Sequence, residues 1–444
     1  FIKMAFGALG HLRGGPAKAA VVGSAATGLI SGSSIANVVT TGTFTIPLMK
    51  RVGFSSEKGG AVEVASSVNG QIMPPVMGAA AFVIAEFMNV PYLTVAVAGL
   101  FPAVIYFFSI FVMVHFEARK KNLTTVPREE LPNLKEEIKK GGHLFISILI
   151  IVGIMVAGYT PMFAAFGGII SILVLSSLRP ETRMTPAQIF SAFEEGARQA
   201  IPVSIACATA GIIIGCVFVS GVGTKFTNLI GELSGGFLWV TLILTMFASL
   251  ILGMGLTTTA VYITLAALVI PALESMGVAP MAAHFFAFYF GLVSAITPPV
   301  ALASFAAAGI AGSNPMQTGF HSFRLGIAKY LLPFMFVYNP ALVFVGSWYE
   351  IIIAVATGFA GIYALTVTTE GWMLEKAGMA TRAFMAVAAF AMFFPQIVIT
   401  ISEWAGGSVI PRGPVTIVGW VLFAIGFILH ATAVKRNKAK EALA

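Results

Sequence analysis

The chain has 444 residues, of which 58% are hydrophobic and only 10% are charged, and its net charge is +8. Soluble domains carry roughly 25% charged residues, so most of this chain must face lipid or other buried helices. Basic loops retained on the cytoplasmic side of a membrane explain the positive charge, and we therefore infer no nucleic-acid partner. At about 20 residues per membrane span, the length allows about ten membrane elements.

The first long apolar stretch, 19–49, does not have the length of a simple span. As a helix it would be about 46 Å long, more than the roughly 30 Å of one hydrocarbon core and too little for two crossings. Basic residues flank it on both sides. We therefore predict a helical hairpin that enters from the cytoplasm and turns back at Ser31-Gly32-Ser33-Ser34. The apolar stretches that follow are 60–88, 92–116, 143–158, 161–178, 199–220, 236–273, 280–311, 330–347, 351–368, 381–401 and 414–432.

The stretch 236–273 predicts a second hairpin, which enters from the opposite side of the membrane. Its neighbours are Glu232 and Glu274, and the nearest basic residue is Lys225. With this topology the C-terminus is cytoplasmic, and most basic residues fall on the cytoplasmic side, as the positive-inside rule requires. These residues include Arg119, Lys120, Lys121, Lys139, Lys140, Arg179, Arg183, Arg324, Lys329, Lys435, Arg436 and Lys438.

An internal repeat relates the two hairpin regions. Identical residues recur 224 positions later, so that Ile46-Pro47 matches Ile270-Pro271 and Pro74-Pro75 matches Pro298-Pro299. Because the two copies start from opposite sides, we predict an inverted-topology repeat with a binding site near the membrane midplane.

The Pro-Pro pairs predict that two helices are broken. A proline inside a helix removes a backbone donor and clashes with the preceding turn. We expect breaks near 69–75 in the stretch 60–88 and near 294–299 in the stretch 280–311. Irregular backbone within a membrane is tolerated where it is buried or lines a polar cavity, and its freed carbonyl groups can bind a small cation. The alternative is that each pair only kinks its helix.

Small polar residues gather at the two hairpin turns, where neutral oxygens suit Na⁺. They are Ser31, Ser33, Ser34 and Asn37 at the first turn, and Gly255, Thr257, Thr258 and Thr259 at the second. Close helix packing is the alternative explanation for them. Glu63 lies within the first broken helix and is the candidate for proton coupling, unless it is an interfacial residue close to Lys58. The chain has no P-loop and no metal-binding spacing, so we expect neither an enzyme nor a cofactor.

The segments Gly28–Asn37, Ile72–Pro75 and Ile296–Val300 resemble the large membrane subunit of tripartite ATP-independent periplasmic (TRAP) transporters, over roughly residues 5–345. The resemblance implies an elevator mechanism in a bacterial inner membrane, a periplasmic substrate-binding protein and a small membrane subunit. The spans after residue 346 are similar to those of the fused permeases of the TAXI branch, in which the small-subunit region would precede Phe1.

The resemblance also implies two ion sites, each formed by a hairpin and the broken helix of its own repeat, with the substrate between the two turns. Ion site one would use Ser31, Ser34, Asn37, Gly70, Met73 and Pro75. Ion site two would use Gly255, Thr258, Ser294, Thr297 and Pro299. The substrate would contact Ser33, Asn69 and Thr257.

The sequence thus predicts an all-α integral membrane protein with two re-entrant hairpins and two broken helices. The segments are a first repeat (1–116), a basic cytoplasmic linker (117–142), scaffold or arm helices (143–235), a second repeat (236–345) and a C-terminal extension of three spans with a basic tail (346–444). We expect ion-coupled import of a small organic acid, a C4–C5 dicarboxylate or keto acid, with Na⁺ or alternatively H⁺ as coupling ion. The alternatives are an autonomous Na⁺/organic-anion carrier and a non-transporting membrane scaffold.

Overall fold

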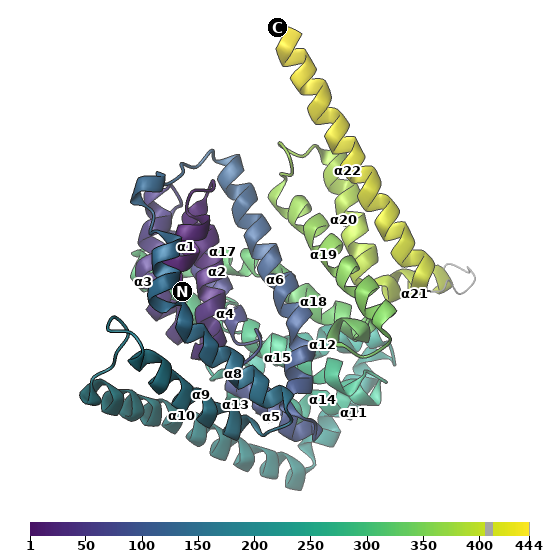
Figure 1. The fold of residues 1–444 in the computed structure, drawn as a ribbon. Helices are drawn as coiled ribbons and strands as arrows, with labels where there is room; N and C mark the ends of the chain where they lie inside the picture. Colours follow the sequence, from purple (N-terminus) through teal and green to yellow (C-terminus); the bar gives the residue numbers. More distant parts are fainter. Residues whose placement is uncertain (405–411, 444) are drawn as a thin grey trace.

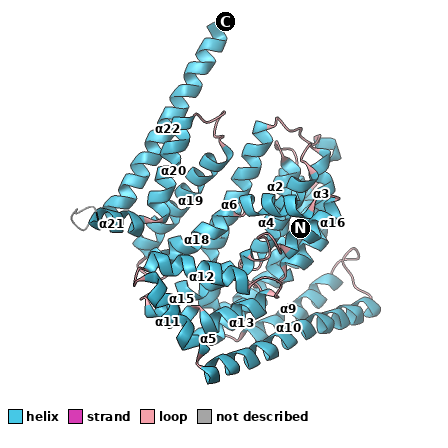
Figure 2. Cartoon of the chain, turned by 180° about the vertical axis from the view of Figure 1, so that it is seen from behind, coloured by secondary structure: helices cyan, strands magenta, loops and turns pink. Residues whose placement is uncertain are grey.

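The computed structural model describes residues 1–404 and 412–443, and within them the chain is helical without a β-strand (Figure 2). Five of the described helices are long and apolar enough to cross a membrane, and several shorter apolar helices accompany them. The predicted class, an all-α membrane protein, is confirmed.

The first repeat contains a helical hairpin followed by a helix in two pieces. Gly32 ends the first arm of the hairpin with a left-handed φ of 60°, a conformation that glycine adopts without steric cost. Ser33 begins the second arm by accepting a hydrogen bond from the N–H group of Ala36. The predicted hairpin and its turn are therefore confirmed. In chain order the helices are α1 (Ile2–Leu9), α2 (Gly15–Ser31), α3 (Ser34–Arg51), α4 (Ser56–Gly70), α5 (Ala79–Met88) and α6 (Tyr92–Lys120).

The second repeat has the same order of elements. Its hairpin turns through residues 253–257, and Gly255 there has a φ of 80°. The helices are α12 (Leu238–Leu252), α13 (Thr258–Leu268), α14 (Ile270–Ser275), α15 (Pro280–Val293), α16 (Leu302–Ala311), α17 (Pro315–Leu325) and α18 (Ile327–Tyr338), followed by the short η3 (Pro340–Val343). The second predicted hairpin is also confirmed.

Both predicted breaks are present and resemble each other in detail. The first separates α4 from α5, and the second separates α15 from α16. Met77 and Ala301, which are 224 positions apart, both have a positive φ just before the second half-helix begins. The Pro74–Pro75 and Pro298–Pro299 peptide bonds are both cis. The Pro-Pro pairs therefore interrupt their helices rather than only kink them.

The two repeats interlock. Helix α16 of the second repeat packs against α3 and α4, and α5 of the first repeat packs against α13. Lys50 near the end of α3 donates a hydrogen bond of 2.9 Å to the carbonyl of Ala311, the last residue of α16. The ring of Phe87 in α5 lies 6.1 Å from that of Tyr262 in α13. Each half of a broken helix is thus held by the opposite repeat.

Each hairpin crosses its own broken helix closely, backbone against backbone in the first repeat and backbone against a serine side chain in the second. A Cβ atom on Gly28 of α2 would lie 2.5 Å from the Cα atom of Gly70 in α4. In the second repeat, a Cβ atom on Gly253 would lie 2.7 Å from the hydroxyl oxygen of Ser294. Ser294 stands 224 positions after Gly70, so the crossings are equivalent. Small residues at these points bring the hairpin turns close to the breaks.

Between the repeats, α9 packs against α8, whereas α10 packs against α13 of the second repeat and lies along one edge of the molecule (Figure 1). The described side chains of α10 are mostly exposed, which suits contact with lipid or another membrane subunit. The segments here are η1 (Arg128–Glu130), α7 (Leu134–Gly141), η2 (Gly142–Leu144), α8 (Phe145–Val156), α9 (Pro161–Ser177), α10 (Pro186–Ser220) and α11 (Val222–Ser234). The residue limits of the predicted domains stay predictions.

The C-terminal extension packs on α6 through its first helix, α19 (Trp348–Glu370). Two ion pairs lie at this end of the bundle: Lys58 with Glu117 at 2.5 Å, and Arg324 with Glu370 of α19 at 3.2 Å. The apolar stretch 381–401 forms two helices, not one, because the chain turns at Phe394 between α20 (Met379–Phe393) and α21 (Pro395–Trp404). Helix α22 (Arg412–Leu443) then runs out beyond the rest of the bundle (Figure 1).

Candidate coupling-ion site

A carboxylate with hydroxyl partners lies inside the first repeat. Glu63 of α4 has no solvent-exposed surface. Its Oε1 atom accepts hydrogen bonds from Ser24 of α2 at 2.7 Å, from Ser67 at 3.1 Å and from Thr41 of α3. Its Oε2 atom accepts one from Thr45 of α3. The two arms of the hairpin and the first half of the broken helix therefore meet at this carboxylate.

The groups in this cluster have the chemistry that a cation or a proton could bind. A buried carboxylate needs hydrogen bonds or a counter-charge, because an isolated charge is costly to remove from water. Four hydroxyl groups supply the hydrogen bonds, and none of the ion pairs in the described part of the chain includes Glu63. The hydroxyl oxygens and the carboxylate are hard ligands, which suit a small cation.

The alternative that Glu63 is an interfacial residue beside Lys58 is wrong. The ammonium of Lys58 is bonded to Glu117 of α6, and Lys121 contacts the same carboxylate at 3.1 Å. Lys58 lies near the start of α4, whereas Glu63 faces inward more than one turn later.

The first hairpin turn brings three of the predicted ligands of ion site one close to the break. Gly32 lies against the backbone of Met77 and Gly78. Ser34 is buried, and Ser31 is partly exposed, with its hydroxyl 3.5 Å from the carbonyl of Ser33. Asn37 is fully buried. Its amide donates to the carbonyl of Ser24, while its side-chain oxygen Oδ1 has no hydrogen-bond donor.

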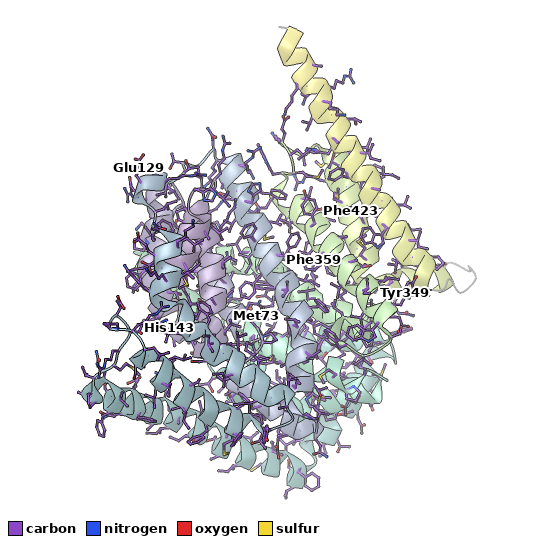
Figure 3. All side chains as sticks on the ribbon, in the orientation of Figure 1. Met73, Glu129, His143, Tyr349, Phe359 and Phe423 are labelled. Atoms are coloured by element: carbon purple, nitrogen blue, oxygen red, sulfur yellow. The ribbon has the colours of Figure 1, made fainter. Side chains whose placement is uncertain are left out.

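The remaining ligands predicted for ion site one lie in or beside the break. Gly70 is the last residue of α4 and forms the crossing with α2. Met73 lies in the middle of the bundle in the view of Figure 3, and its carbonyl accepts no backbone hydrogen bond from the described residues. The hydroxyl of Tyr92 lies 3.1 Å from the carbonyl of Pro75 and closer to that of Val76, so its single proton is shared between the two carbonyl groups.

Two of the side chains predicted for ion site two, those of Ser294 and Thr297, have protein partners. The hydroxyl of Ser294 donates toward the carbonyls of Gly253 and Gly291, and that of Thr297 contacts the carbonyl of Val293 and the hydroxyl of Tyr330. Thr258 is half-buried at the start of α13. Gly255 and Pro299 are both exposed. The second site is therefore more open and has fewer free side-chain oxygens than the first.

The three residues predicted to bind substrate do not lie together in one site. Ser33 and Thr257 are exposed and precede the first residues of α3 and α13. Asn69 is fully buried, and its amide donates to the carbonyl of Ala103 at 3.0 Å. Within the described chain, no hydrogen bond connects these residues.

Sequence reasoning missed the hydroxyl partners of Glu63. A signal for two of them exists, because Ser24 and Thr41 stand at equal distances from the turn of the hairpin, and their hydroxyl oxygens lie 3.3 Å apart. Thr41 and Thr45 are one helical turn apart, as are Glu63 and Ser67, so each pair faces one side of its helix.

Lys329, which the charge pattern counts among the basic residues of the cytoplasmic side, is buried inside the bundle. Its side chain has no exposed area, and its Nζ atom donates a hydrogen bond of 3.1 Å to the carbonyl of Val68 in α4. The positive-inside rule counts lysines near the ends of spans, and it cannot recognise a lysine that a carbonyl group holds inside the bundle.

These features define a class of protein: a multi-pass membrane transporter subunit with paired hairpins and broken helices. The family model described as "Tripartite ATP-independent periplasmic transporter, DctM component" matches residues 1–351. The chain belongs to this family of TRAP transporter large permease subunits, and it is a transporter membrane subunit rather than an enzyme. Its members work with a periplasmic binding protein and a small membrane subunit in the inner membrane.

Curated relatives are similar over most of their length. A C4-dicarboxylate TRAP transporter large permease protein of Pseudomonas aeruginosa is 25% identical over 313 residues, which are 70% of this chain and 72% of the relative. A sialic acid TRAP transporter large permease protein of Vibrio cholerae is 23% identical, covering 76% of this chain and 77% of the relative. A putative TRAP transporter large permease protein of Haemophilus influenzae is 24% identical, covering 66% and 68%.

Proposed function

We propose that this chain imports a small organic acid by coupling its movement to that of a cation, and that Glu63 is the coupling group. The observation that carries the proposal is the buried carboxylate of Glu63 with its four hydroxyl donors, where hairpin α2–α3 meets α4. A proton that binds there neutralises the carboxylate, and a Na⁺ ion would find the same hard oxygens. Either ion would change the charge inside the hairpin as it binds and leaves.

The predicted Na⁺ sites at the hairpin turns stay part of the proposal. Ser34, Asn37 and the carbonyl of Met73 are the residues of site one that retain free oxygen atoms near the break. In site two, the hydroxyl of Thr258 and the backbone carbonyl groups of the exposed turn at Gly255 are the available ligands. A cation at either turn would connect a hairpin to the broken helix it crosses.

The substrate in this proposal is a carboxylic acid, such as a C4–C5 dicarboxylate or a keto acid. Two relatives are named for acids, a C4-dicarboxylate and sialic acid. The N-termini of α3 and α13 lie at the hairpin turns, and their free N–H groups and helix dipoles favour an anion. The exposed hydroxyls of Ser33 and Thr257 stand beside these N-termini.

We further propose an elevator movement of the hairpins with their broken helices, with substrate delivered by the periplasmic protein. The extension that begins at α19 supports assignment to the fused TAXI branch, as does its packing on α6. An autonomous carrier would take up substrate without the periplasmic protein, and a scaffold would show no ion response at all.

Melting of the purified protein tests whether it binds a coupling ion. We expect NaCl to raise the melting temperature relative to choline chloride, or acidification to do so, and Glu63→Gln to remove the response. A ligand at about 100 times its Kd stabilises the folded state by about 2.7 kcal/mol, which is large enough to detect. Ser34→Ala and Thr258→Ala report on the two hairpin turns separately. A wild-type protein that responds to neither Na⁺ nor pH would contradict ion coupling.

A further inference from the structure

Lys329 is a buried ionisable residue that the proposed coupling site does not use. It lies near the start of α18, has no exposed surface, and contacts α4 through the carbonyl of Val68 at 3.1 Å. No ion pair in the described residues includes it. An ionisable residue without a charged partner inside a membrane bundle is expensive, and this makes it a candidate for function.

The carbonyl that Lys329 contacts is free because α4 is broken. In a continuous helix, the N–H group of Ile72 would donate to the carbonyl of Val68. Here it donates to Asn69 instead, at 3.0 Å. The carboxyl end of a helix also carries the negative end of the helix dipole, which favours a cation. Lys329 therefore places its amine where the interrupted helix presents negative potential.

Two aromatic faces complete the surroundings of the ammonium group. Its Nζ atom lies 5.1 Å from the ring centre of Tyr106 in α6 and 5.6 Å from that of Tyr289 in α15. Both distances are within the range of cation–π attraction. One carbonyl oxygen and two π-faces make a site for a small organic or alkali cation, and the protein fills it with its own side chain.

The equivalent position in the other repeat has no charge. The residue 224 positions before Lys329 is Ile105, although Tyr330, the next residue, matches Tyr106. The two tyrosines keep similar roles, since each hydroxyl bonds to the broken helix of its own repeat: Tyr106 to the carbonyl of Ala65, and Tyr330 to Thr297. The repeats thus differ by a buried lysine side chain beside one break only.

We propose that the ammonium of Lys329 is a covalently attached substitute for a mobile monovalent cation at the carboxyl end of α4. The site takes an alkylammonium or alkali ion once the side chain is removed. The substitute stays in place during each transport cycle, so the carbonyl of Val68 at the end of α4 needs no ion from solution, whereas the proposed ion site at the hairpin turn is separate from it. That Lys329 reduces the number of coupled ions rests on the proposed transport function. Binding of a cation to the site emptied by Lys329→Ala does not depend on it.

The test compares a variant that empties the site with one that fills it without charge. Lys329→Ala leaves space for a cation, whereas Lys329→Met keeps most of the volume of the side chain. We expect methylammonium chloride to raise the melting temperature of Lys329→Ala by about 3 °C or more relative to choline chloride. It should not do so for the wild type or for Lys329→Met. NaCl in place of methylammonium chloride shows whether the site also accepts an alkali ion.

Lys50→Ala is the matched control, because the Lys50 ammonium also bonds to a carbonyl at the end of a helix but is not enclosed. It should show no response specific to methylammonium. A folded Lys329→Ala protein that responds to neither cation would overturn the proposal. If Lys329→Ala does not fold, the stability of Lys329→Met is the deciding measurement. A stability equal to that of the wild type would overturn the proposal. A loss of stability in Lys329→Met that Lys329→Arg does not show supports it. These readouts need no transport, so they remain valid if import itself is disproved.

Discussion

Replacement of Glu63 by glutamine is expected to abolish accumulation of substrate while exchange of substrate across the membrane continues. Glutamine has nearly the same shape, and the hydroxyls of Ser24, Thr41, Thr45 and Ser67 can reorient around it. The variant should therefore fold, but it can no longer release and take up a proton or balance a cation. One elementary charge moved through about 100 mV is worth about 2.3 kcal/mol, so at that potential the loss of one coupled charge lowers the accumulation ratio by about 50-fold.

Uptake and counterflow in proteoliposomes measure the two activities separately. Glu86→Gln is the control, because Glu86 is a carboxylate of the same repeat that lies exposed on α5. It should accumulate substrate like the wild type. Normal accumulation by Glu63→Gln would contradict the assigned role, and so would loss of both activities in a folded Glu63→Gln protein, since that would indicate a structural role.

Substitution of Gly70 by alanine is expected to separate the first hairpin from its broken helix. The new Cβ atom would lie 2.5 Å from the Cα atom of Gly28 and 3.2 Å from its carbonyl carbon, and neither backbone can move without the other. Overpacking of this kind costs about 1–3 kcal/mol. The carbonyl group of residue 70 is kept, so a loss of stability or ion response reports on the helix crossing rather than on a deleted side-chain ligand.

The melting temperature in detergent measures this effect, with Gly309→Ala as control. Gly309 lies inside α16, and an added Cβ atom there meets nothing within 4 Å. Alanine should stabilise that helix by up to about 1 kcal/mol. If Gly70→Ala melts at the wild-type temperature, then the close crossing does not constrain the hairpin.

The hairpins and breaks could be predicted because they follow from local properties of the chain. The length of the stretch 19–49 and its basic flanks are incompatible with a simple span, and the Pro-Pro pairs interrupt a helix wherever they occur. The 224-residue offset then relates the two halves. These features can be recognised in the sequence without knowing which helices contact one another.

The surroundings of Glu63 and Lys329 could not be predicted in the same way. The donors of Glu63 come from three helices, and the contacts of Lys329 come from α4, α6 and α15. The first set depends on how the hairpin folds onto α4, and the second depends on how the two repeats interlock; no single stretch of sequence encodes either. The charge pattern placed Lys329 among the cytoplasmic basic residues because it contains no information on a carbonyl released by a break in another helix.

The most direct test of coupled transport is uptake of labelled C4–C5 dicarboxylates and keto acids by the reconstituted protein. The proteoliposomes should contain the chain with its small membrane subunit or the equivalent region, and the cognate periplasmic protein should be added outside. Our proposal predicts uptake that requires the periplasmic protein and an inward gradient of Na⁺ or H⁺, and that collapses when an ionophore removes the gradient. Uptake that is unaffected by both gradients would contradict it.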